Sequence, residues 1–149
     1  MLAQVLDEEA YRAYRHRLEA FLGIPIDASD IEIHALIEAR FPAGRIKMLC
    51  EQGVVCTAAL SQIISPNTLN SRCARRQRLT LGESDRVFRF AHITAMAETL
   101  FGDDQKAQRW LSKPKQRFAM EPPYALLSTS LGTLLVEEFL IQVAEGLAL

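Results

Sequence analysis

The fold is decided by residues 83–101, ESDRVFRFAHITAMAETLF, which predict one long helix. Its apolar side chains occupy more than half of the helix circumference, so most of this helix must be covered. The helix is expected to end at Gly102, because glycine readily adopts the left-handed conformation that closes helices. Helical periodicity continues on both sides, and no run of strict apolar–polar alternation exceeds a few residues, so we predict an all-α fold.

Capping and turn signals divide the rest of the chain into shorter helices. Ser29 has capping-box spacing to Glu32, which predicts the start of a helix. Ser65 can cap another helix in which Pro66 takes the first position. Helices are therefore expected at residues 7–22, 29–41, 43–52, 57–64, 66–77, 103–111 and 129–145.

The charge is unevenly distributed along the chain. The 149 residues hold 17 Lys plus Arg and 18 Asp plus Glu, a formal charge of -1, which argues against nucleic-acid binding through bulk charge. Residues 1–40 hold eight acids and four bases, residues 41–89 hold three acids and eight bases, and residues 90–149 hold seven acids and five bases. The basic middle segment predicts a local anion-binding surface, with a solvated helix face as the alternative. Its arginines include Arg72, Arg75, Arg76, Arg78, Arg86 and Arg89.

The helix expected over residues 66–77 carries hydrogen-bond donors and cations on one side. Helical spacing turns Leu69 and Cys73 towards a core and leaves the other side polar. A short helix, a tight connection and a second helix with such a face predict a helix-turn-helix, whose second helix enters the DNA major groove. Asn and Arg can bond base edges, and Arg can also contact phosphates. The candidate DNA-binding residues are Asn67, Thr68, Asn70, Ser71, Arg72, Arg75 and Arg78.

The carboxy-terminal part has more apolar surface than a small helical unit usually buries by itself. This surface predicts a protein partner or self-association, with a core shared with the amino-terminal helices as the alternative. We interpret Trp110 and Leu111 as core residues, because the short helix that carries them needs an anchor. The candidate partner-binding residues are a polar stripe on the last helix and the apolar tail, namely Glu138, Gln142, Glu145, Gly146, Leu147, Ala148 and Leu149.

No pattern in the sequence indicates an enzyme, a metal site or a bound cofactor. Ser84 and His92 lie eight residues apart on one predicted helix, about 12 Å of rise, so they cannot form a triad with Asp85. His34 and Glu38 predict an ordinary helical i,i+4 pair. The chain has no Gly-rich phosphate loop, and its three cysteines form no CxxC pair. Without a signal-peptide core or an apolar run of roughly 18 residues, we expect a cytoplasmic protein that does not enter membranes.

Two groups of residues carry a family resemblance. Residues 81–89, LGESDRVFR, are followed in order by Leu100-Phe101-Gly102-Asp103, Trp110-Leu111, Pro123, Leu126-Leu127, Gly132, Val136, Leu140 and Gly146. Ahead of them stand Phe41-Pro42-Ala43, Gly53 and Ser65-Pro66-Asn67-Thr68-Leu69. In this order and spacing, the first group resembles the toxin-binding domain of the Xre/MbcA/ParS antitoxins. The second group resembles the Xre-like helix-turn-helix that precedes that domain.

The resemblance implies an all-α antitoxin of a type II toxin–antitoxin system. It implies a DNA-binding helix-turn-helix domain over residues 31–82 and a toxin-binding domain over 83–149, and we read residues 1–30 only as a helical extension ahead of them. The implied partner is a RES-type, NAD-consuming toxin with an ADP-ribosyltransferase-like fold, whose active site the antitoxin covers. The family also implies a homodimer that represses its own operon by binding operator DNA. The alternative is a helix-turn-helix regulator whose carboxy-terminal domain serves only for dimerisation.

Two places depart from the family pattern. Ile63 stands where a glycine is common in the turn of the helix-turn-helix, and a β-branched residue resists the left-handed conformation, so a different turn is expected. Ala119 and Met120 replace the glycines usual before the proline of the toxin-binding domain, which predicts a stiffer loop. Residues 1–30 find no support in the resemblance.

Overall fold

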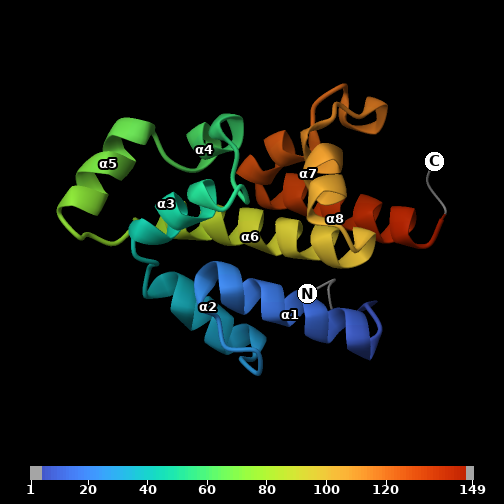
Figure 1. The fold of residues 1–149 in the computed structure, drawn as a ribbon, viewed down its shortest axis with the longest axis horizontal. Coiled ribbons are helices and arrows are strands. Elements are labelled where there is room, and N and C mark those ends of the chain that lie inside the picture. Colours follow the sequence, from blue (N-terminus) through green and yellow to red (C-terminus); the bar gives the residue numbers. More distant parts are fainter. Residues whose placement is uncertain (1–4, 147–149) are drawn as a thin grey trace.

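A computed structural model describes residues 5–146, which form eight α-helices and short 3₁₀ turns, with no β-sheet among them. The predicted all-α fold is confirmed. The elements are α1 (Glu8–Leu22), α2 (Asp30–Glu38), α3 (Gly44–Glu51), α4 (Thr57–Ile63), α5 (Pro66–Ala74), α6 (Leu81–Phe101), α7 (Asp104–Ser112), η2 (Gln116–Phe118), η3 (Pro123–Ser128) and α8 (Ser130–Ala144) (Figure 1).

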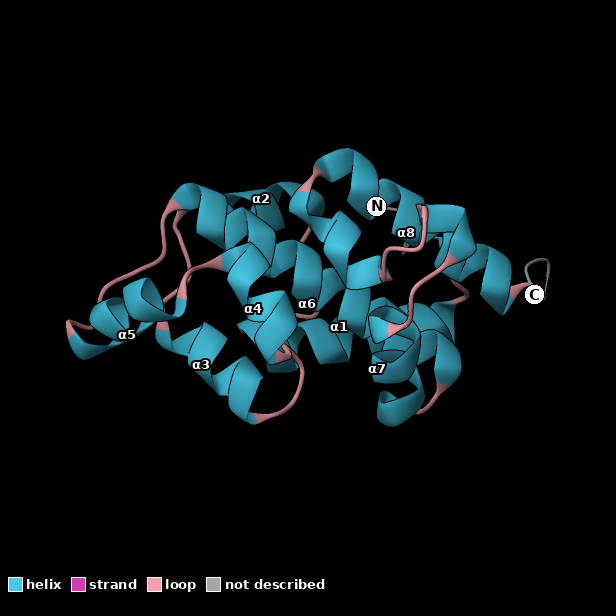
Figure 2. Ribbon diagram, turned by 90° about the horizontal axis from the view of Figure 1, so that it is seen from above, coloured by secondary structure: helices cyan, strands magenta, loops and turns pink. Residues whose placement is uncertain are grey.

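The long helix α6 is the centre of the molecule. Helices α1 and α2 pack along one side of α6, and α4, α7, η3 and α8 pack elsewhere on its surface (Figures 1 and 2). All nine residues from Phe90 to Glu98, more than two turns of the helix, are buried. The prediction that this helix is covered over most of its circumference is therefore confirmed, and the cover comes from the chain itself.

Helix α1 shares the core with α6. Its limits follow local signals, since the Asp7 side chain accepts from the Ala10 N–H and Gly23 closes the helix with a left-handed φ of 70°. Tyr14 and Leu18 are fully buried. The apolar surface of the carboxy-terminal helices is thus partly covered by the amino-terminal helices. The division of the chain into domains after residues 30 and 82 stays a prediction.

Capping residues begin the helices at the predicted places, but α5 is shorter than predicted. Ser29 and Glu32 form the expected capping box, and Ser65 caps α5 with Pro66 in its first turn. The prediction of a helix over residues 66–77 was wrong at its end, because α5 stops at Ala74 and the chain turns away through Arg76, at φ 53°. Residues beyond Arg75 therefore do not continue the helical face.

The segment between α7 and α8 contains two strained residues. Ala119 and Met120, at φ 53° and 67°, both adopt the left-handed conformation that glycine favours. The turn is closed by the Met120 N–H, which donates to the Lys115 carbonyl at 2.9 Å, and by the Lys115 N–H, which donates to the Glu121 carbonyl at 3.1 Å. Glycine, which is usual in the family at these two positions, would suit this left-handed backbone. This chain adopts the same backbone with alanine and methionine instead.

Candidate functional site

The turn between α4 and α5 is short and contains no left-handed residue. Ile63 ends α4, Ile64 is extended at φ −160°, and Ser65 already caps α5. Ile63, Ile64 and Leu69 are buried and anchor the two helices in the core. We expected this turn to differ from the usual turn that contains a left-handed glycine. It does differ, because an extended residue connects the two helices.

The exposed side of α5 presents amide and hydroxyl groups. Asn67, Asn70 and Ser71 are exposed, as the helical spacing predicted. Thr68 is half-buried, and its hydroxyl accepts a hydrogen bond of 2.7 Å from the Ser65 hydroxyl. Asn67, Asn70 and Ser71 are therefore accessible to a ligand, whereas the Thr68 hydroxyl belongs to the helix cap.

The three arginines predicted to bind DNA lie in different environments. Arg72 points back towards α6, where it forms an ion pair with Glu83 and leaves only 21% of its side chain exposed. Arg75 caps the end of α5 and is exposed. Arg78 lies beyond the helix, and its guanidinium donates to the Arg40 carbonyl at 2.6 Å. Arg75 still follows the helical path, because its N–H donates to the Ser71 carbonyl at 3.1 Å, but the placement of Arg78 on a continuous helical face with Asn70 was wrong, since the helix has already ended.

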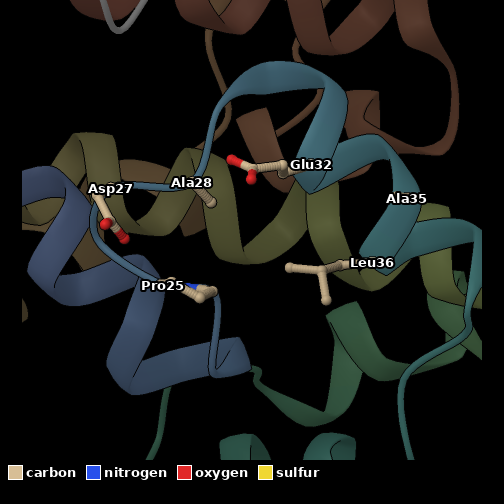
Figure 3. A pocket seen from close by; sticks show the side chains of 6 residues that line it. All are labelled: Pro25, Asp27, Ala28, Glu32, Ala35 and Leu36. Atoms are coloured by element: carbon tan, nitrogen blue, oxygen red, sulfur yellow. The ribbon is translucent and has the colours of Figure 1, made fainter.

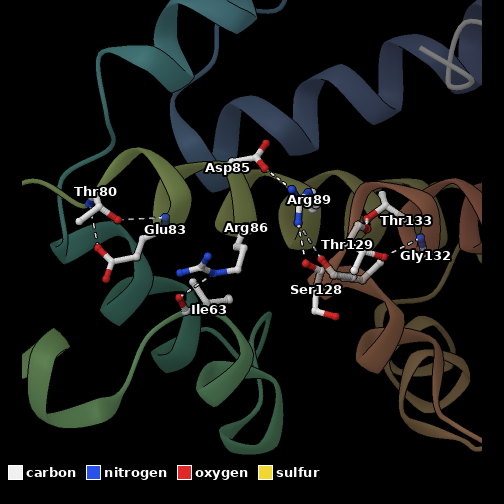
Figure 4. A network of polar contacts seen from close by, with 11 residues as sticks. Ile63, Thr80, Glu83, Asp85, Arg86, Arg89, Ser128, Thr129, Gly132 and Thr133 are labelled. Atoms are coloured by element: carbon white, nitrogen blue, oxygen red, sulfur yellow. Dashed lines mark hydrogen bonds and ion pairs between the residues drawn. The ribbon is translucent and has the colours of Figure 1, made fainter.

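Two further arginines of the basic segment bind backbone carbonyls inside the molecule. The Arg86 guanidinium donates to the Ile63 carbonyl at 3.1 Å, at the end of α4. Arg89 donates to the Ser128 carbonyl at 3.1 Å and forms an ion pair with Asp85 (Figure 4). Counting every arginine of residues 41–89 therefore overestimates the size of the anion-binding surface. Arg72, Arg86 and Arg89 instead hold α5, α4 and η3 against α6.

The predicted partner-binding stripe lies on the carboxy-terminal half of α8, far from α5 (Figures 1 and 2). Glu138 is exposed, and half-buried Gln142 accepts a hydrogen bond from the Arg117 guanidinium. Glu145 caps the helix, and Gly146 follows at φ 72°. The other three predicted tail residues, Leu147, Ala148 and Leu149, lie outside the described residues.

The amino-terminal half of α8 presents an apolar face that sequence reasoning assigned to no site. Leu131, Leu134 and Leu135 are 67%, 41% and 43% exposed, and their spacing places them on one side of the helix. Met120, also exposed, belongs to the preceding strained turn. A groove of about 590 Å³ borders this face and is lined in part by Leu131 and Leu135. Apolar side chains at this helical spacing are typical of a contact surface.

Sequence reasoning also missed a buried polar chain that joins three helices. The Tyr14 hydroxyl on α1 lies 2.6 Å from Nδ1 of His92 on α6, whose Nε2 bonds Glu137 on α8. Burial raises the pKa of Tyr14 far above its ordinary value, so its hydroxyl keeps its proton. The signal that could have found this chain was a histidine on a helix that must be covered, since a buried imidazole needs partners.

The enzyme arrangements that the sequence excluded do not form. Ser84 accepts from the Phe41 N–H at 3.0 Å, and Asp85 pairs with Arg89, so neither meets His92. His34 and Glu38 form the predicted i,i+4 pair on the surface. Among the described residues, no group of His, Cys, Asp and Glu side chains could hold a metal ion. No helix in this part of the chain is long and apolar enough to cross a bilayer.

Two further open pockets lie outside these predicted sites. The first, of about 420 Å³, is lined by the loop after α1 and by α2, and one of its two acids, Glu32, is engaged in the capping box (Figure 3). Its lining residues are Pro25, Asp27, Ala28, Glu32, Ala35 and Leu36. The second, of about 600 Å³, contains buried Glu98, which lies 3.3 Å from the Arg17 guanidinium. Burial raises the pKa of Glu98 to about 7.

Comparison with known proteins decides the family. A protein of Pseudomonas putida named Antitoxin Xre is 53% identical over 149 residues, which cover all of this chain and 94% of that protein. The chain belongs to the Xre antitoxin family. A family model described as the antitoxin Xre/MbcA/ParS C-terminal toxin-binding domain matches residues 96–146. The family resemblance predicted from the sequence is therefore confirmed.

Two further relatives, which align over shorter stretches, carry the same name. Antitoxin Xre of Photorhabdus laumondii is 29% identical over 85 residues, and Antitoxin Xre of Yersinia enterocolitica is 33% identical over 84 residues. Each alignment covers 56% of this chain and 57% of the relative. Antitoxins are generally not enzymes, and membership of this family implies a cognate toxin as the partner.

Proposed function

We propose that this chain neutralises an NAD-consuming, RES-type toxin with an ADP-ribosyltransferase-like fold by covering the entrance to the toxin's active site. The toxin-binding part is residues 83–149, and the complex forms in the cytoplasm. Support comes from the family model, whose matched segment, residues 96–146, contains the whole of α8. The antitoxin itself needs no cofactor in this mechanism, because NAD belongs to the toxin.

The observation that carries this proposal is the apolar face of α8. Leu131, Leu134 and Leu135 remain exposed although α6 and η3 already cover the other side of the helix. Burying a leucine against a partner stabilises a complex by roughly 1.5–3 kcal/mol. The polar stripe Glu138, Gln142 and Glu145 lies farther along the same helix, and Gly146 leads into the apolar tail of residues 147–149. A toxin that contacted the leucines, the stripe and the tail would cover α8 from end to end.

A second part of the proposal is repression of the antitoxin's own operon through α4 and α5. Asn67, Asn70 and Ser71 form an exposed row of groups that can bond base edges. Residues 31–82 would form the DNA-binding domain, residues 1–30 an extension of it, and a homodimer would place two copies of α5 on an operator with two half-sites.

The test of toxin neutralisation is co-expression with the toxin encoded beside this chain. Leu131→Ser combined with Leu135→Ser should restore growth arrest and NAD loss, because a partner no longer buries two leucines. Ile31→Ser is the matched control, since Ile31 is 72% exposed on α2, outside the family match. If the double variant neutralises as well as Ile31→Ser does, α8 is not the contact surface. A lack of any adjacent toxin would favour the regulator whose carboxy-terminal domain only dimerises.

A further inference from the structure

Two segments that carry four arginines, residues 40–43 and 75–79, lie side by side at the α5 end of the molecule, whose backbone is drawn in Figures 1 and 2. The chain after α5 pairs with the chain between α2 and α3, since the Leu79 N–H donates to the Phe41 carbonyl at 2.9 Å. Arg78 strengthens the pairing by donating to the Arg40 carbonyl at 2.6 Å. The pairing holds Arg40 next to residues 75–78, although the two segments are far apart in sequence.

The four side chains form a cationic surface without neutralising acids. Arg40, Arg75, Arg76 and Arg78 are all exposed, and none forms an ion pair with another described residue. Arg72, by contrast, is neutralised by Glu83. The uncompensated positive charge at this end therefore comes from the two connecting segments more than from α5 itself, and one of its members, Arg40, lies outside the basic segment of the sequence.

Two of these arginines occupy a strained backbone conformation. Arg40 and Arg76 have φ of 68° and 53°, in the region that residues with a Cβ rarely adopt and that glycine adopts at no steric cost. Glycine or asparagine would fit these positions better. Strain of this kind is concentrated at positions that serve binding. Both strained positions nevertheless carry arginine. This choice indicates that the guanidinium group has a role there that outweighs the cost of the backbone strain.

We propose that Arg40, Arg75, Arg76 and Arg78, here called the arginine loops, bind the sugar-phosphate backbone of duplex DNA. This inference rests on the proposed operator binding and assigns different contacts to the arginine loops and to α5. The arginine loops supply affinity that is independent of sequence, and the exposed amides and hydroxyl of α5, next to them, read the bases.

DNA phosphate is favoured over an acidic protein surface by position. The planar guanidinium group presents donors in a fork that matches phosphate and carboxylate oxygens alike, so the neighbouring groups decide between the two partners. The arginine loops adjoin Asn70 and Ser71, whose groups suit base edges, and they lie at the opposite end from the matched toxin-binding segment in Figures 1 and 2.

The experiment measures the affinity of the full chain for two duplexes of equal length, one from upstream of its own operon and one unrelated, over a range of salt concentrations. The test variant is Arg40→Gly combined with Arg76→Gly, which removes two charges and relieves the strained backbone. Arg40→Asn with Arg76→Asn repeats the test with a second residue that tolerates the left-handed conformation. The matched control is Arg12→Ala with Arg109→Ala, two exposed arginines on α1 and α7.

Each phosphate contact contributes about 0.9 to the slope of log K against log salt, so the test variant should lose roughly two from that slope. At about 0.1 M salt this corresponds to a loss of affinity of roughly tenfold per arginine, equal for both duplexes. The midpoint of thermal unfolding should not fall, and the control should bind like the wild type. Asn70→Ala should instead weaken the operon duplex more than the unrelated one.

The outcomes separate this inference from the function on which it rests. If the wild type binds neither duplex, operator binding and the arginine loops both fail. If the wild type binds but the glycine and asparagine variants keep its salt slope, the arginine loops alone are refuted. Unchanged DNA binding together with weakened toxin neutralisation would also overturn the inference, because the loops would then serve a protein partner.

Discussion

Among the glycines, Gly132 is the position at which one added methyl group should destabilise the fold most. A Cβ built there would lie 1.9 Å from the carbonyl oxygen of Leu126 and 3.0 Å from the Thr129 hydroxyl oxygen. Real Cβ atoms essentially never approach within 3.0 Å, so the first turn of α8 and the end of η3 must separate by about 1.1 Å. Neither neighbour is the flexible end of a long side chain, because one is backbone and the other caps α8.

The magnitude of this effect follows from the interactions that the separation would break. Overpacking costs about 1–3 kcal/mol. The Thr129 cap, whose hydroxyl accepts from the Gly132 N–H at 2.9 Å, is worth about 1 kcal/mol. The bonds from Arg89 to the carbonyls at the end of η3 are worth about as much (Figure 4). Alanine gains about 1 kcal/mol of helix propensity in return, so Gly132→Ala should lower the free energy of unfolding by roughly 2–4 kcal/mol.

Urea unfolding followed by far-ultraviolet circular dichroism measures this difference. The matched control is Gly82→Ala in the first turn of α6, where the added Cβ would meet only the flexible end of Arg86 at 3.3 Å. Because propensity then dominates, this control should be neutral or more stable by up to about 1 kcal/mol. Of these two substitutions, only Gly132→Ala should therefore destabilise the protein. A Gly132→Ala protein as stable as the wild type would refute the close approach of η3 and α8.

Three further perturbations test the strained turn, the buried carboxyl and the tail. Ala119→Gly and Met120→Gly should each raise the free energy of unfolding by roughly 0.5–1 kcal/mol, whereas Ala20→Gly, on the exposed side of α1, should lower it by a similar amount in the same urea assay. Glu98 has a folded pKa of about 7 against an ordinary 4.5, so the folded state binds more protons between these values and stability falls as pH rises through them. The loss of stability between pH 5 and pH 8, measured from urea midpoints, should therefore be smaller in Glu98→Gln by about 1–2 kcal/mol. This figure allows for screening of Glu98 by its arginine partner and by water. Deletion of residues 147–149 should weaken toxin inhibition in an NAD assay without changing the unfolding midpoint, and unchanged inhibition would remove the tail from the interface.

Local signals in the sequence predicted the ends of helices well. Ser29 with Glu32, and Ser65 with Pro66, act within one turn of backbone, so their effect does not depend on the rest of the fold. The end of α5 was predicted too late, because Arg75 and Arg76 carry no breaking signal. The chain turns there because its next residues pair with the segment before α3, more than thirty positions earlier, and no local pattern contains that pairing.

The candidate sites were predicted less well, for a reason that concerns long side chains. Charge counting treats every arginine as available, yet Arg86 reaches a carbonyl 23 positions away and Arg89 one 39 positions away. His92 was evaluated only against its helical neighbours, whereas its partners lie 78 and 45 positions distant. Exposed leucines on α8 could not be separated from buried ones, because the helix is apolar on nearly all sides. Only the packing of η3 and α6 against it decides which leucines remain outside.

The arrangement of arginines also decides which substitutions can separate the two proposed activities. Arg72, Arg86 and Arg89 lie between α6 and the elements that carry one surface or the other, so replacing any of them leaves a carbonyl or carboxylate without its partner and shifts a whole helix. Loss of DNA binding in such a variant would say nothing about contact with DNA. Exposed side chains that hold no other element in place can be removed without this effect, such as Arg76 beyond the end of α5 and Leu131 in the first turn of α8. If DNA binding and toxin neutralisation use separate surfaces, Arg76→Gly must spare neutralisation and Leu131→Ser must spare DNA binding.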